Sequence, residues 1–162
     1  MSFELNETTG KYIVTGELSD EQIVEMANEI SRNKFSKGQL LTSPSESREY
    51  LQNLYQGYER EVFVVVFLDN QHRVITSEEM FVGTINASSV YPREVVKTAL
   101  KHNAASLVAV HNHPSGDPEP SQADRRITRR LIDALSLVDI RVLDHIVVGT
   151  EGSTSFAERG WI

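Results

Sequence analysis

The sequence predicts an α/β fold (α+β) in which a mixed β-sheet is flanked by helices and follows a short N-terminal helical extension. Short segments rich in Val, Ile and Phe lie between turn residues, which predicts buried strands. These segments alternate with amphipathic segments that open with helix-start signals, and this alternation favours helices packed on one sheet. With 162 residues, 40% of them hydrophobic, the chain can form one domain and a short appendage.

Two helix starts mark the N-terminal part of the chain. Residues 19–22 (Ser-Asp-Glu-Gln) have the pattern of a capping box and predict a helix that runs to about Arg32. Ser43 before Pro44 is a second start signal, because proline is favoured at the first helical position. That second helix is expected to end near Tyr58.

A polar segment, residues 31–39, is a plausible linker between these two helices. We therefore place the N-terminal helical extension at residues 1–42 and the main domain at residues 43–162.

The main domain is predicted to alternate between strands and helices. Its first strand is apolar at every position from Val62 to Leu68, which predicts burial on both faces, as in a central strand. In chain order, the predicted elements are strands at 61–68 and 72–85, a helix at 92–103, a strand at 104–113, a helix from 121 to about 137, a final strand at 140–149 and a locally packed segment at 153–162.

Composition excludes several classes of site. The chain has no cysteine, so disulfides, thiolate zinc sites and a cysteine nucleophile are all excluded. The longest apolar run, residues 62–68, is too short to span a bilayer, and the N-terminus lacks the basic and apolar regions of a signal peptide. We therefore expect a cytoplasmic protein with no membrane contact.

Charge argues against general binding to nucleic acid. The net charge is −7, and an acidic chain attracts phosphate backbones poorly. One basic stripe stands out at helical spacing, formed by Arg125, Arg126, Arg129 and Arg130. A solvated helix face is the simpler interpretation of this stripe. A contact for nucleic acid or another partner is the alternative interpretation.

The segment "HNHPSGDPEPSQAD", residues 111–124, contains the candidate metal ligands. His111 and His113 end a predicted strand, where side chains at i and i+2 share a face, so both imidazoles point the same way. Two imidazoles and a carboxylate are a typical ligand set of catalytic zinc, with the fourth position left for water. Asp117, Glu119 and Asp124 are the candidate carboxylates, and Asp124 is favoured because it is fixed on the first turn of a helix.

A hydrolytic site also needs a general base and support for an oxyanion. Ser121 is a predicted helix N-cap, and its hydroxyl could also donate to an oxyanion beside the metal. Glu61 is the favoured base because it stands at the head of the apolar strand, although a charged strand end is the simpler interpretation. The candidate carboxylates upstream of the histidines are Glu59, Glu61, Glu78, Glu79 and Glu94.

The pattern of a distant Glu, His-x-His, seven residues and Ser-x-x-Asp resembles the JAMM metalloprotease signature, which is also called the JAB or MPN domain. The segments "REVFVVVFLDNQHRVI", "GTINASSVYPREVVKTAL" and "VDIRVLDHIVVG" extend the likeness to the bacterial RadC family over residues 43–162. Residues 1–42 are too short for the helix-hairpin-helix segment of longer RadC proteins and lack a glycine-bearing hairpin between helices, so we expect the short, standalone form.

The resemblance implies a site residue by residue. It places His111, His113 and Asp124 on Zn²⁺, Ser121 beside the tetrahedral intermediate, and Glu61 as the base that activates water at the metal, with Glu59 as the alternative base. It implies a JAMM-type hydrolase that cleaves a peptide or isopeptide bond in an unidentified peptide or protein substrate. The alternative function is a non-catalytic or DNA-associated binding module, of the DNA-repair or mobile-element kind, that retains the metal site.

Overall fold

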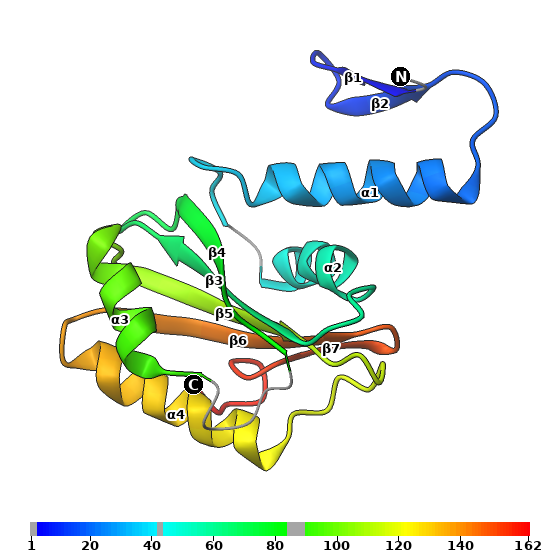
Figure 1. Ribbon diagram of the computed structural model, residues 1–162. Helices are drawn as coiled ribbons and strands as arrows, with labels where there is room; N and C mark the ends of the chain where they lie inside the picture. The colour runs from blue at the N-terminus through cyan, green and yellow to red at the C-terminus, as the bar shows by residue number, and fades with distance from the viewer. Residues whose placement is uncertain (1–2, 42–43, 84–89) are drawn as a thin grey trace.

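A computed structural model of the chain describes residues 3–41, 44–83 and 90–162 (Figure 1). A small N-terminal hairpin and a long helix precede a sheet that carries helices on both faces. In chain order, the elements are β1 (Phe3–Asn6), β2 (Lys11–Val14), α1 (Asp20–Lys34), α2 (Pro44–Tyr55), β3 (Val62–Leu68), β4 (Val74–Val82), α3 (Pro92–Lys101), β5 (Ser106–Asn112), α4 (Gln122–Ser136), β6 (Arg141–Gly149) and β7 (Gly152–Ser155).

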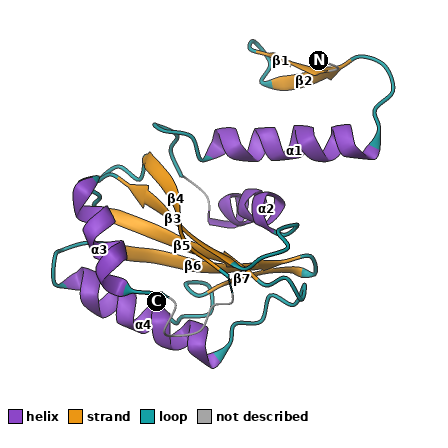
Figure 2. Ribbon diagram, in the orientation of Figure 1, coloured by secondary structure: helices purple, strands orange, loops and turns teal. Residues whose placement is uncertain are grey.

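The main sheet has five strands in the order β4-β3-β5-β6-β7 (Figure 2). Strand β3 pairs antiparallel with both β4 and β5, whereas β5 and β6 are parallel neighbours. The parallel pair needs a crossover connection, and α4 supplies it. The predicted mixed sheet flanked by helices is therefore confirmed.

Alternation along β3 divides the core between the two faces of the sheet. Phe63 and Phe67 belong to the cluster that includes residues of α3 and α4, whereas Val64 and Val66 belong to the cluster that includes Leu51 of α2. Every residue of β3 is buried. The strand is therefore covered on both faces, as its unbroken apolar run predicts.

The helix starts follow their sequence signals. Ser19 accepts a hydrogen bond from the backbone N–H of Gln22, and the Gln22 side chain accepts one from the backbone N–H of Ser19, which completes the predicted capping box. Helix α2 ends at Tyr55, three residues before the expected end at Tyr58, and its predicted cap Ser43 lies outside the described residues. No helix within the described ranges is both long and apolar enough for a membrane span.

Two elements were not predicted. The extension contains the β1–β2 hairpin in addition to its helix, and the Asn6 side chain closes the turn by accepting from the N–H groups of Thr8 and Thr9. The C-terminal segment includes β7, whose Gly-Ser-Thr-Ser sequence has little β-propensity of its own. Strand β7 forms because it pairs antiparallel with β6, which is a tertiary interaction.

Asp144 is a buried carboxyl on the α2 face of β6. It lines an apolar cavity of about 280 Å³ together with Leu51 and Val108. Burial raises the pKa of Asp144, although hydrogen bonds from Ser155 and two backbone N–H groups act in the opposite direction. Since the folded-state pKa exceeds the ordinary value, folding favours the neutral carboxyl. The resulting stabilisation is present below the unfolded-state pKa and is lost as the pH rises through the folded-state pKa.

The free energy of unfolding of the wild type therefore includes a contribution from Asp144 that declines from about pH 4 upward. Asp144→Asn is expected to remove this contribution. Chemical denaturation at several pH values measures this change. Asp133→Asn is the control, because it removes an exposed carboxylate. Parallel pH profiles for the wild type and Asp144→Asn would contradict the assignment.

Candidate metal centre

The end of β5 positions the two histidines. His111 pairs with Phe63 of β3, and its ring stacks on the Phe63 ring with centroids 6.0 Å apart. His111 therefore lies on the α4 face of the sheet and is only 1% exposed. His113 follows the last residue of the strand, and its backbone N–H donates to the carbonyl of Val148 in β6. The neighbouring strands thus fix the backbones of both histidines independently of any ligand.

Three side chains converge at this strand end. The Nε2 atoms of His111 and His113 lie 3.0 Å apart, and Asp124 places Oδ1 3.2 Å from His111 Nε2 and Oδ2 3.3 Å from His113 Nε2. In a tetrahedral zinc site with ligand bonds of about 2.0–2.2 Å, neighbouring ligand atoms are separated by roughly 3.3 Å. The chemistry and the spacing of this donor set therefore fit a zinc ion.

Asp124 reaches the histidines from the first turn of α4. Its backbone N–H donates to Ser121 Oγ at 3.1 Å, and its Oδ2 accepts from the backbone N–H of Ser121 at 2.7 Å. Burial acts to raise the pKa of Asp124, but the contacts of its oxygens with the His111 and His113 rings hold it well below its usual range. The carboxyl is therefore an anion, which is the form that binds a cation.

His113 is held through its other ring nitrogen. Its Nδ1 lies 2.9 Å from the backbone carbonyl of Asp117, which only accepts, so Nδ1 carries the proton and Nε2 faces the centre. The hydrogen bond to Asp124 raises the pKa of His113 in the zinc-free protein, whereas burial opposes that change.

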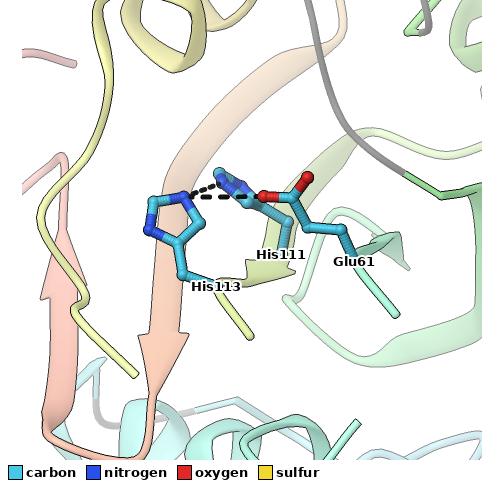
Figure 3. Close-up of side chains that lie close together, drawn as sticks. All are labelled: Glu61, His111 and His113. Atoms are coloured by element: carbon cyan, nitrogen blue, oxygen red, sulfur yellow. Dashed lines mark hydrogen bonds and ion pairs between the residues drawn. The ribbon is translucent and has the colours of Figure 1, made fainter. Parts of the chain in front are cut away.

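Glu61 is the residue that precedes β3, and its carboxylate points toward the two histidines (Figure 3). Its Oε1 lies 3.9 Å from His113 Nε2, farther than Asp124, and its side chain is 18% exposed. Ligand atoms of Glu61, His111 and His113 all lie within 4.8 Å of one another, so Glu61 also has the position of a possible ligand. Asp124 lies nearer to His113 than Glu61 does, so the geometry favours Asp124 as the ligand and leaves the outer position to Glu61.

The residue between the histidines positions Glu61, and sequence reasoning missed it. Asn112 is fully buried, and its Oδ1 accepts from the backbone N–H of Val62 at 2.8 Å. Its Nδ2 donates to the carbonyls of Arg60 at 3.0 Å and Tyr58 at 3.3 Å. One side chain therefore ties the segment that carries Glu61 to the strand that carries both histidines.

His145 of β6 is a second residue that sequence reasoning missed. Asp144 and His145 point to opposite faces of β6, and only His145 faces the centre. His145 is fully buried beneath the centre, and its Nε2 lies 2.7 Å from Nδ1 of His111. Burial lowers the pKa of His145 well below the ordinary value, so its ring is neutral. Its only sequence signal is a histidine within an apolar strand.

The other candidate residues lie around the centre. Ser121 is exposed at the N-cap of α4 and is joined to Asp124 by the two capping hydrogen bonds. Among the alternative ligands, the Asp117 side chain accepts from the Glu119 N–H, and Glu119 forms a bidentate ion pair with Arg159 at 2.8 and 2.7 Å. The alternative base Glu59 is exposed on the surface before Glu61.

A glycine contact holds the loop after His113. A Cβ atom on Gly149 would lie 2.2 Å from the carbonyl oxygen of Gly116, so only glycine fits this approach. The Gly116 carbonyl accepts from the N–H of Glu151 at 3.0 Å, which fixes the loop to the β6–β7 turn.

Sequence comparisons identify the family of the chain. Residues 41–161 match the family model described as the RadC-like JAB domain. A UPF0758 protein of Vibrio cholerae is 56% identical over 152 residues, which cover 94% of this chain and 96% of that protein. A UPF0758 protein of Vibrio parahaemolyticus is 60% identical over 140 residues, which cover 86% of this chain and 62% of that protein. The chain therefore belongs to the RadC family and carries a RadC-like JAB domain over most of its length.

Proposed function

We propose that the protein is a zinc-dependent hydrolase of JAMM type that cleaves a peptide or isopeptide bond. The observation that carries the proposal is the convergence of His111, His113 and Asp124 at tetrahedral spacing, with Glu61 at 3.9 Å from His113. Three protein ligands and an adjacent carboxylate are the composition of a catalytic site, whereas structural zinc sites take four protein ligands. Membership of the JAB domain family supports a hydrolase at the level of the fold.

Bound zinc would polarise the substrate carbonyl and make a neighbouring water molecule more acidic. Glu61 accepts the proton of the attacking water, because its carboxylate lies beside the ligand set and is partly exposed to solvent. The resulting carboxylic acid then donates that proton to the leaving amine. Ser121 Oγ accepts from the Asp124 N–H, which leaves its own hydrogen free to donate to the developing oxyanion.

The surface beside Glu61 offers access for a substrate. A hollow of about 580 Å³ opens there. Its lining residues come from the segment before β3, the end of β4 and the loop after His113, namely Glu59, Arg60, Glu61, Val82, Gly83, Pro114 and Ser115. An extended peptide that lies in this hollow would pass next to the base, which supports a peptide or protein substrate.

A peptide library tests the proposed activity. Purified protein should cleave peptides in the library, and also isopeptide-linked peptides if these are the substrate class. Chelation should abolish the cleavage, and added zinc should restore it. Activity that persists after complete metal removal would contradict the proposal, as would a zinc-loaded protein that cleaves neither kind of bond.

The arginine stripe of α4 supports a second candidate function, binding of an anionic partner such as nucleic acid. Arg125, Arg126, Arg129 and Arg130 are all exposed, and within the described ranges none of them is ion-paired. The Arg125 guanidinium lies 4.1 Å from the ring centre of Trp161, which adds an aromatic surface to the stripe.

Binding to single- and double-stranded DNA at increasing salt tests this candidate. Specific use of the stripe predicts binding that weakens with salt and that is lost when Arg126 and Arg130 are changed to glutamine. Absence of binding at low salt would eliminate it.

A further inference from the structure

We propose that Thr128 and His145 fix the tautomer of His111, so that its Nε2 atom is unprotonated and available to a metal ion. The three side chains form a buried hydrogen-bond chain that runs from α4 through β6 to β5. This inference rests on the proposed metal centre and adds two positioning residues to it. Neither residue touches the metal position; both act through His111.

The geometry of the chain is continuous. Nδ1 of His111 lies 2.7 Å from Nε2 of His145, and Nδ1 of His145 lies 2.5 Å from Thr128 Oγ1. Thr128 Oγ1 also lies 2.7 Å from the backbone carbonyl of Asp124, to which it donates. All three side chains are buried, with exposed fractions of 1% for His111, 0% for His145 and 3% for Thr128. Water is therefore not available as a substitute partner.

Packing holds the His145 ring in this orientation. The ring stacks on Phe156 with centroids 4.6 Å apart, and it meets Phe63 edge-on at 5.5 Å. A small rotation of the ring would break these contacts, and a 180° flip would break both hydrogen bonds. The position of each nitrogen is therefore fixed, and the hydrogen-bond chain determines only which nitrogens carry the protons.

A neutral imidazole carries one proton, so the chain has two possible directions. In the first, His111 Nδ1–H donates to His145 Nε2, and His145 Nδ1–H donates to Thr128 Oγ1. In the second, Thr128 donates to His145 Nδ1, His145 Nε2–H donates to His111 Nδ1, and the proton of neutral His111 is on Nε2. Only the first direction leaves a lone pair on His111 Nε2, and that nitrogen is the one that lies 3.2 Å from Asp124 Oδ1.

Thr128 selects the first direction. Its hydroxyl hydrogen is directed to the Asp124 carbonyl, as in other threonines that bond to the carbonyl four residues earlier in a helix. The oxygen then accepts from His145 Nδ1–H, which leaves His145 Nε2 as an acceptor for His111. His113 is oriented in the same way by the Asp117 carbonyl, so each histidine presents Nε2 to the centre while its Nδ1–H is held.

Thr128→Val tests the role of the hydroxyl, because valine has nearly the same shape and cannot accept from His145 Nδ1–H. The proton of His145 is then favoured on Nε2, since an unpaired buried acceptor is less costly than an unpaired buried donor. Zinc affinity, measured by competition with a chelating dye, is expected to fall by about 10- to 100-fold. Thr128→Ser keeps the hydroxyl and is expected to retain an affinity close to that of the wild type.

The tautomer itself is measured by long-range ¹H–¹⁵N correlation spectra of the histidine rings in the wild-type protein, with and without zinc. The proposal predicts a proton on Nδ1 of His145 and none on its Nε2 in both samples. A proton on Nε2 of His145, or equal zinc affinity in folded Thr128→Val and wild type, would overturn the inference and leave the metal centre intact. Wild-type protein that binds no zinc would instead overturn the proposed function, and the zinc-free spectra would still decide the direction of the chain.

Discussion

Glu61→Gln is expected to slow hydrolysis by roughly 10²- to 10⁴-fold while zinc binding stays close to the wild-type value. Glutamine keeps the size of the side chain but cannot accept a proton from water. The proposed ligand set is unchanged, because Asp124 lies 3.2 Å from His111 and 3.3 Å from His113, whereas Glu61 lies 3.9 Å from His113. The rate should be measured on the peptide that the wild type cleaves best, together with the zinc content of each sample.

Glu59→Gln is the matched control for this variant. Glu59 lies two residues away, is exposed and lines the same surface hollow, so its loss tests the local charge without removing the base. We expect the control to cleave at the wild-type rate. If Glu59→Gln were inactive and Glu61→Gln active, the base would have been assigned to the wrong carboxylate. If Glu61→Gln lost its zinc, Glu61 would be a ligand.

Asp124→Asn should weaken zinc binding by roughly 100-fold or more, because one of three protein ligands loses its charge. The substitution is mild for the fold, since the amide oxygen can still accept from the backbone N–H of Ser121 and preserve that half of the capping box. It should also lower the pKa of His113 in the zinc-free protein, since the hydrogen bond to Asp124 is the main cause of its elevation. Chelator competition measures the first effect, and NMR titration of the ring measures the second.

Asp117→Asn provides the comparison for Asp124→Asn. The Asp117 carboxylate accepts from the Glu119 N–H in the neighbouring loop, and only its backbone carbonyl contacts His113. Its replacement should leave zinc affinity within a few-fold of the wild type. Equal affinity of the wild type and Asp124→Asn would mean that another group completes the centre.

The local part of the centre follows from the sequence because it lies within one strand-to-helix connection. Strand alternation places His111 and His113 on one face, and helix capping places Asp124 at the start of α4. These rules act over a few residues, so they need no knowledge of the sheet order. Glu61 lies about fifty residues earlier and was assigned mainly from the family resemblance.

The support of the centre depends on contacts between distant segments. Asn112 reaches the backbone before β3 only because β3 pairs with β5, and His145 reaches His111 only because β5 and β6 are parallel neighbours. In the register of this strand pair, His145 lies opposite Ala109, which precedes His111 by two residues on the same face of β5. Propensity and periodicity say nothing about which strands are neighbours, so neither residue could be assigned a role from the sequence. Strand β7 was missed for the same reason.

Zinc content per chain is the most direct test of the proposed centre. Purified wild-type protein, incubated with zinc and then freed of loosely bound metal, should hold one zinc ion per chain by elemental analysis. His113→Ala should hold none, whereas His102→Ala, which removes a histidine paired with Glu78 away from the centre, should hold one. Zinc at equal stoichiometry in the wild type and His113→Ala, or no zinc in the wild type, would contradict the metal centre formed by His111, His113 and Asp124.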